Sequence, residues 1–263
     1  MLGNDIDHLE NKTIWMFWTG KNELSVTRLI ALERFRQVNR DCDVRLITHD
    51  IITQLLPNMH EGYQFLSETH KSDYLRCYFL HYFGGGYADI KEPCNNWVSC
   101  FEKFQNDTSL IGCGYKELGP NHTAYLQSCN LDPQKSVYCR EFSLNKDETG
   151  WCSERLKKNW YKLIGNGCYI FRKRTAFTQD WWNGLHEKME GYYDSLKQNP
   201  ASWPQDRLWR GYPGDLNPDG SGPSKYPLSW SGILGNIFHP LVLKYSDNIS
   251  QDLPKFYDRE KYR

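Results

Sequence analysis

The charged residues best suited to chemistry lie in the segment KSDYLRCYFLHYFGGGYADIKEP, residues 71–93. Asp73 and Arg76 are three residues apart, so on a helix they would share the polar side of one turn. Asp89 and Lys91 follow a run of glycines and a short apolar stretch. In an α/β fold, a carboxylate at the carboxyl end of a strand can hold a nucleotide sugar or its divalent cation. The segment therefore predicts a binding site built from a helix and the end of a strand.

Periodicity predicts the elements that would position these residues. The apolar residues before the glycines form one face at a period near 3.6, which predicts a helix. These residues are Tyr74, Leu75, Tyr78, Phe79, Tyr82 and Phe83. Thr69 or Ser72 is suited to cap its start. Glycines 84–86 would end the helix and allow a positive φ or a close approach of backbones. Residues 87–90 would then form a short buried strand.

The rest of the chain alternates between β-prone and helical patterns. We expect further strands at 13–19, 43–48, 110–115 and 165–172, helices at 25–39, 50–56 and 175–195, and a last apolar segment at 233–245. This order predicts an α/β fold with a mostly parallel central sheet flanked by helices.

The chain is expected to be one domain with two functional halves. Residues 1–115 would bind one substrate, and residues 116–263 would bind the other. Residues 116–158 are weakly patterned and polar, and we expect loops and short elements there. Residues 199–231 are rich in Pro, Gly, Trp and Tyr and are long for an ordinary connection, which favours a functional loop.

The composition limits the classes of function. The chain has 263 residues, with 32 basic and 32 acidic side chains and a formal net charge of +0. A neutral chain without a basic stripe argues against nucleic acid or an anionic membrane as a partner. No apolar run reaches the roughly 18 residues of a transmembrane helix, and the polar start is unlike a secretory signal. We therefore expect a cytoplasmic protein with reduced cysteines, and the lack of a C-x-x-C pair argues against a zinc site.

Two stretches, IWMFWTGKNE and SDYLR…FGGGYADIKEP, occur in this order within roughly the first hundred residues. The second resembles the pattern S-D-x-x-R…G-G-x-Y-x-D-x-D-x-x-P of the DxD-containing sugar transferases of family 32, of capsular polysaccharide synthesis proteins and of glucosylating bacterial toxins. The first resembles the first-strand segment of the same group. The resemblance implies a GT-A (Rossmann-like) fold. It also implies transfer of a sugar from a UDP-sugar donor to a glycan hydroxyl, in the synthesis of an oligosaccharide or surface glycan.

The resemblance also implies roles for individual residues. Trp18 matches the aromatic residue that stacks on the uracil ring, although Trp15 and Phe17 compete for this role. Asp73 and Arg76 match the helical pair that hydrogen-bonds the donor sugar. An arginine suits this position because its planar fork can hold hydroxyls or phosphate oxygens.

Gly85 and Asp89 complete the donor-binding set, and Asp89 matches the first acid of the DxD motif. The second acid would contact a metal, but Lys91 stands there, and an ammonium cannot bind Mn²⁺ or Mg²⁺. Asp89 could bind the cation with Glu92 and a distant ligand, Lys91 could itself neutralise the diphosphate, or the site could have lost catalysis. His239 is the candidate distant ligand and would favour Mn²⁺, although it could equally be a buried structural histidine. We expect a Mn²⁺-dependent enzyme.

Asp206, in ASWPQDRLW, is the first candidate for the catalytic group near the anomeric carbon. Its surroundings resemble the Q-D helix start of several retaining GT-A enzymes, and a helix N-cap is the alternative. Asp180 and Asp215 are weaker candidates. One or two of the tryptophans in the second half are expected to line an acceptor groove by stacking on sugar rings. The tryptophans considered are Trp181, Trp182, Trp203, Trp209 and Trp230.

Two other classes of function fit the same residues. A catalytically decayed carbohydrate- or nucleotide-binding protein would also tolerate Lys91, and detectable turnover would exclude it. A sugar-phosphate transferase on a similar fold would release UMP instead of UDP.

Overall fold

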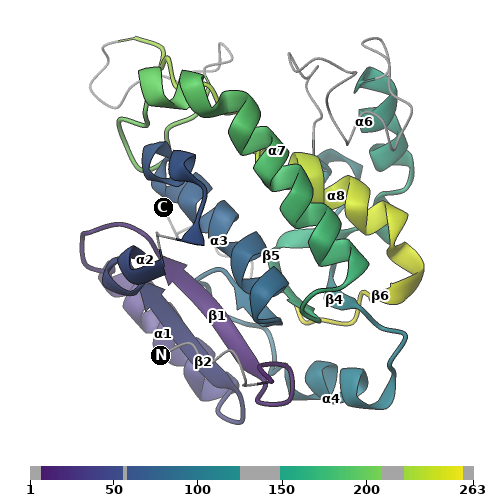
Figure 1. Cartoon of the computed structure of the whole chain (residues 1–263). Coiled ribbons are helices and arrows are strands. Elements are labelled where there is room, and N and C mark those ends of the chain that lie inside the picture. Colours follow the sequence, from purple (N-terminus) through teal and green to yellow (C-terminus); the bar gives the residue numbers. More distant parts are fainter. Residues whose placement is uncertain (1–6, 56–57, 125–148, 209–221, 257–263) are drawn as a thin grey trace.

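The protein is described by a computed structural model that covers residues 7–55, 58–124, 149–208 and 222–256 (Figure 1). The strands are β1 (Thr13–Trp18), β2 (Asp43–Thr48), β3 (Gly85–Ala88), β4 (Gly112–Lys116), β5 (Ile164–Phe171) and β6 (Ile249–Ser250). The α-helices are α1 (Val26–Val38), α2 (His49–Leu55), α3 (Glu68–Tyr82), α4 (Val98–Asn106), α6 (Thr149–Lys158), α7 (Ala176–Gln198) and α8 (Gly235–Lys244).

The strands form one mixed sheet in the order β2-β1-β3-β5-β4-β6. β1 is parallel to β2 and β3, and β4 is parallel to β6, whereas β5 is antiparallel to both β3 and β4. The predicted α/β class is confirmed, with both halves of the chain contributing strands to one sheet. The direction of β5 was not predicted, because the long connection before it can return the chain from either end of the sheet.

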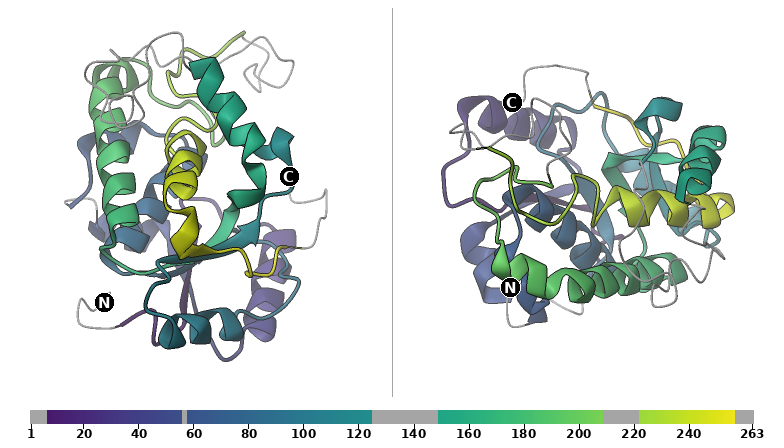
Figure 2. Two further views of the ribbon diagram at one scale, coloured as in Figure 1. Left: turned by 90° about the vertical axis from the view of Figure 1, so that its right-hand side faces the viewer. Right: turned by 90° about the horizontal axis from the view of Figure 1, so that it is seen from above.

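Alternate side chains of β1 face the two layers of helices. Ile14 and Met16 pack in an apolar cluster with residues of α1 and α4. Trp15 and Phe17 pack in a second cluster with residues of α3, α7 and α8. Figure 2 shows these two groups of helices on opposite sides of the sheet. β1 is therefore buried on both faces, as predicted for a central strand.

Helix α3 carries the predicted apolar face, but it begins earlier than the sequence indicated. Ser67, rather than Thr69 or Ser72, caps its start by accepting a hydrogen bond from the backbone N–H of His70. Two glycines follow the helix with positive φ, 70° at Gly84 and 90° at Gly85.

Gly85 also lies against the neighbouring strand. A Cβ atom at this position would lie 2.7 Å from the carbonyl oxygen of Thr13 in β1. The close approach lets β3 start two residues earlier than predicted, at Gly85, and end at Ala88. As a result, Asp89 is the first residue after the strand.

The second half of the chain holds more regular structure than predicted. Helix α6 lies within residues 116–158, where loops and short elements were expected. The described parts of residues 199–231 contain neither a helix nor a strand, in line with the predicted loop. Trp209 and Asp215 lie outside the described residues. In the part of the chain that the structure describes, no helix combines the length and apolar composition needed to cross a membrane.

Candidate functional site

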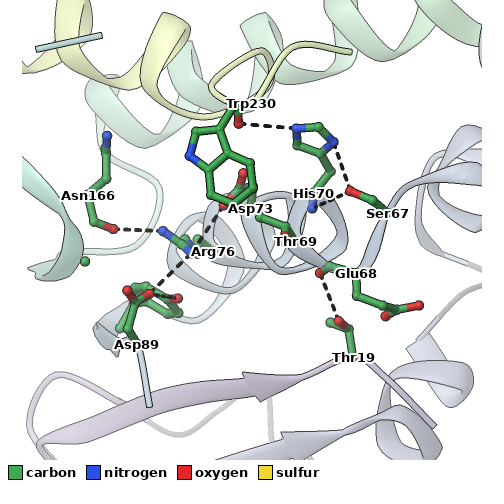
Figure 3. A network of polar contacts seen from close by, with 12 residues as sticks. Thr19, Ser67, Glu68, Thr69, His70, Asp73, Arg76, Asp89, Asn166 and Trp230 are labelled. Atoms are coloured by element: carbon green, nitrogen blue, oxygen red, sulfur yellow. Dashed lines mark hydrogen bonds and ion pairs between the residues drawn. The ribbon is translucent and has the colours of Figure 1, made fainter. Parts of the chain in front are cut away.

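The carboxyl ends of β1 and β3 meet at one edge of the sheet. Trp15 pairs with Tyr87, so Asp89 lies level with Phe17 near the end of β1. The hydroxyl group of Thr19 donates a hydrogen bond of 2.9 Å to the carbonyl of Glu68, which ties this edge to the first turn of α3 (Figure 3). The ends of both strands and the start of α3 therefore surround one region.

Arg76 joins the helix to the strand end (Figure 3). Its Nη2 lies 3.2 Å from Asp73 Oδ1 and 3.3 Å from Asp89 Oδ1. Its Nη1 donates a 2.8 Å hydrogen bond to the backbone carbonyl of Asn166 in β5, and its guanidinium carbon lies 4.4 Å from the centre of the Tyr87 ring. One buried cation thus serves two carboxylates that come from different elements.

Both carboxylate oxygens of Asp89 have partners. Oδ1 accepts a 2.7 Å hydrogen bond from the Tyr87 hydroxyl, and Oδ2 accepts one of 2.8 Å from Lys91 Nζ. Burial raises the pKa of Asp89, but the opposing effects of Lys91 and Arg76 prevail and lower this pKa to about 2. Asp89 is therefore an anion at neutral pH, held by two cations.

Asp73 has the opposite character. Its side chain is buried, and burial raises its pKa to about 7, against the lowering effect of Arg76 and with the help of the Asp89 charge. A carboxyl group with such a pKa both donates and accepts protons near neutral pH. Two acids with such different pKa values around one arginine are typical of functional sites.

A pocket of about 670 Å³ opens at the carboxyl ends of β1 and β2. Its lining comprises Trp18, Gly20, Lys21, Asn22, Glu23, Leu24, Leu29, Thr48, His49 and Asp50. The indole N–H of Trp18 donates a 2.6 Å hydrogen bond to the Asn22 carbonyl, which holds the ring at the pocket wall. The volume falls within the range of small-molecule pockets, about 300–1,000 Å³.

Asp206 lies in a loop beside the start of α3 and not at a helix start. Its Oδ2 accepts a 2.8 Å hydrogen bond from the backbone N–H of Ser202. Its Oδ1 is buried and has no hydrogen-bond partner among the described residues. The backbone N–H of Thr69 donates a 3.0 Å hydrogen bond to the Pro204 carbonyl, so this loop is fastened to the helix that carries Asp73.

His70 of α3, which was not predicted as a site residue, holds residues 226–230 of the same loop by hydrogen bonds. Its Nε2 faces the carbonyls of Ser229 and Trp230 at 3.0 and 3.3 Å, so this nitrogen carries the proton (Figure 3). Its Nδ1 then accepts a hydrogen bond from the Tyr226 hydroxyl at 2.9 Å. Burial lowers the pKa of His70 to about 4, which keeps the ring neutral. Trp230, a residue that is 47% exposed, is thereby held beside the first turn of α3.

Two of the predicted site residues are placed elsewhere. Gly85 begins β3, at the end of the strand opposite to Asp89. His239 lies in α8, where its Nδ1 accepts a 2.9 Å hydrogen bond from the backbone N–H of Ala124 and its Nε2 lies 3.4 Å from Glu117 Oε2. The acid beside His239 is therefore Glu117, and the structure does not bring the histidine to Asp89.

The residues around Asp89 do not fit a divalent cation. The ligands expected from the sequence are Asp89, Glu92 and His239. Asp89 is paired with Lys91, and Glu92 is paired with Arg34 at 2.6 Å. His239 lies beside Glu117. Within the described ranges, no group of three or more His, Cys, Asp and Glu side chains is arranged to hold a metal ion. Two side chains, Lys91 and Arg76, place positive charge at the end of β3.

Two further residues of the site were also missed in the sequence. Tyr87 could have been found, because residues two apart on a strand share a face, and Tyr87 is two residues before Asp89. Asn166 contributes a backbone carbonyl, which leaves no mark in a sequence. No protein-family model and no curated protein matches this chain.

Proposed function

We propose that this protein is a glycosyltransferase of the GT-A type that transfers a sugar from a UDP-sugar to a hydroxyl group of a glycan. The observation that carries the proposal is the position of Arg76, which joins Asp73 of α3 to Asp89 at the end of β3. A pocket large enough for a nucleoside opens at the ends of the two neighbouring strands. In α/β folds, ligands bind at this edge of the sheet.

Each group has a part in the proposed reaction. The uracil ring lies in the pocket against Trp18, and the rest of the donor reaches α3 and the end of β3. The bond between the anomeric carbon and the diphosphate oxygen breaks, and its electron pair stays on UDP. The acceptor oxygen forms the new bond to that carbon, and its proton leaves to the departing phosphate or to water. The transition state has oxocarbenium character, as in glycoside hydrolysis, so a nearby carboxylate stabilises it.

Asp206 is the carboxylate proposed for this position, because its Oδ1 is buried without a partner among the described residues. We expect Asp206→Asn to lower turnover roughly 100-fold or more, the usual loss when one group that stabilises transition-state charge is removed. Turnover is measured as UDP release, and circular dichroism reports the fold. Asp180, a weaker candidate in the sequence, lies near the start of α7 in an ion pair with Lys244, and α7 follows the end of β5 that pairs with Gly85, opposite to Asp89. Asp180→Asn is therefore the matched control. Near wild-type turnover of Asp206→Asn would remove the assignment.

The function itself is tested by nucleotide release from a panel of UDP-glucose, UDP-galactose, UDP-xylose and UDP-N-acetylglucosamine. We expect slow UDP release from one of these donors in the absence of an acceptor. Release of UMP would identify transfer of a sugar phosphate instead. No release from any donor by the folded protein would contradict a UDP-sugar transferase.

One observation favours a second candidate, a nucleotide-binding protein without turnover. Asp89 is already neutralised by Lys91 and Arg76, which a protein that only binds its ligand would tolerate. UDP binding in calorimetry together with no release from any donor would establish this alternative.

A further inference from the structure

We infer that Lys91 and Arg76 take the place of a divalent cation, so that the donor diphosphate is bound and released without a metal ion. This inference rests on the proposed function and specifies how its leaving group is neutralised. Departure of a nucleoside diphosphate builds negative charge on the phosphate oxygens, and a metal ion or fixed cations must stabilise it.

Both carboxylate oxygens of Asp89, where a metal ion would bind after β3, already have partners. Asp89 Oδ2 is 2.8 Å from Lys91 Nζ, and Asp89 Oδ1 is 2.7 Å from the Tyr87 hydroxyl and 3.3 Å from Arg76 Nη2. A divalent ion bound to Asp89 would lie beside the ammonium of Lys91 and the guanidinium of Arg76. Like charges at such distances repel strongly in a partly buried site.

Glu92 is the other carboxylate near the end of β3 that was expected to help bind a cation. Glu92 is buried and lies 2.6 Å from Arg34 Nη1, so its carboxylate already has a cation. The carbonyl of Ile90, between the two acids, accepts a 2.6 Å hydrogen bond from Arg28. The segment that follows β3 is thus held to α1 by arginines, and each of its two acids is paired with a positive charge.

Lys91 and Arg76 differ in how far a phosphate group can reach them. The side chain of Lys91 is 35% exposed, so its ammonium can leave Asp89 and meet a phosphate. Arg76 is only 10% exposed and is fixed by four neighbours, so it supplies a positive charge that does not move. Lysine binds phosphate as a compact point charge, and arginine does so as a planar fork. Together they provide one adjustable and one fixed cation.

The test is calorimetric titration of UDP into the full chain, once with EDTA and once with Mn²⁺. For the wild type we expect dissociation constants that agree within threefold in the two conditions. We expect Lys91→Ala to weaken binding at least tenfold in EDTA. Lys91→Asp restores the acid of the resembled pattern, and we expect it to bind UDP more tightly with Mn²⁺ than with EDTA. Thermal unfolding of each variant confirms that it is folded.

Lys244→Ala is the matched control. Lys244 pairs with Asp180 at 2.9 Å with 34% exposure, which closely matches Lys91 and Asp89. This variant should bind UDP as the wild type does in both conditions.

Three results would overturn the inference. Wild-type binding that requires Mn²⁺, or that becomes more than tenfold tighter with it, would leave the proposed function standing and remove the metal-free donor site. Unchanged binding of UDP by Lys91→Ala in EDTA would remove the role of Lys91. Absence of UDP binding in both conditions would overturn the donor site itself and the inference with it.

Discussion

Two aspartates in this protein have nearly the same immediate partners. Each accepts one hydrogen bond from a lysine and one from a tyrosine close in sequence to that lysine. The partners are Lys91 at 2.8 Å and Tyr87 at 2.7 Å for Asp89, and Lys244 at 2.9 Å and Tyr245 at 2.6 Å for Asp180. The exposed fractions of the two carboxylates are also close, 22% and 24%. The local motif alone therefore does not define a site.

The difference lies in what surrounds each motif. Asp180 belongs to α7, and its lysine and tyrosine come from the end of α8 and the residue after it. Asp89 directly follows a central strand, and it also contacts a buried arginine, which in turn contacts a second acid, Asp73. A buried cation between two acids cannot be removed without leaving charges unmatched, whereas a partly exposed pair can exchange its partners for water. The coupling to Arg76 is what distinguishes Asp89 from Asp180.

The largest effect is expected from removing that coupling. Arg76→Leu leaves two carboxylates at the site with one fewer cation and should lower the free energy of unfolding by about 3–5 kcal/mol. Lys244→Leu removes the partner of Asp180 and should lower the free energy of unfolding by only about 0–1 kcal/mol, because water replaces the lost partner. Urea denaturation of both variants measures the difference. Similar losses in the two variants would abolish the distinction between the regions.

A smaller effect is expected from the proton on Asp73. Its folded-state pKa is about 7, above the ordinary value of 3.8, so its contribution to stability is complete below pH 3.8 and is lost as the pH rises through 7. Between pH 5 and 7 this loss amounts to about 2 kcal/mol, since each pH unit changes stability by up to about 1.4 kcal/mol. Asp89, with a folded pKa of about 2, contributes stability that is lost only as the pH falls below 3.8.

Denaturation of the wild type and of Asp73→Asn at pH 5 and pH 7 isolates this term. The variant should lose about 2 kcal/mol less than the wild type between the two pH values, because its amide does not titrate. Asp180→Asn is the control, and its stability should change between pH 5 and pH 7 as that of the wild type does. Parallel pH profiles of wild type and Asp73→Asn would show that Asp73 titrates in its ordinary range.

Features of the site that depend on neighbouring residues could be predicted from the sequence, whereas contacts between distant residues could not. The apolar period of α3, the glycines after it and Asp89 at the strand end follow from local patterns, because steric and hydrophobic preferences act over a few residues. The bond from Arg76 to the Asn166 carbonyl joins residues 90 positions apart, and no local pattern encodes it.

His70 and His239 show why burial was the harder part. Both are fully buried, and the Nδ1 atom of each accepts a hydrogen bond from a residue distant in the sequence. A ligand histidine and a structural histidine look alike in a sequence, because the difference lies in which acceptors the fold places around the ring. The direction of β5, which sets the position of Asn166, depends likewise on a long connection and not on the strand's own residues.

A third effect separates the two tyrosines. Tyr87 is buried and donates to a carboxylate that also meets Arg76, so Tyr87→Phe should cost about 1.5–3 kcal/mol, the range for hydrogen bonds to charged groups. Tyr245 is only partly buried, and water can replace its hydroxyl on Asp180, so Tyr245→Phe should cost less than about 1 kcal/mol. Urea denaturation measures both values, and a double-mutant cycle with Arg76→Lys asks whether Tyr87 and Arg76 are coupled. Additive effects in that cycle would mean that the Tyr87 hydroxyl stabilises Asp89 independently of the arginine, and the Asp89 cluster would then be two separate contacts rather than one site.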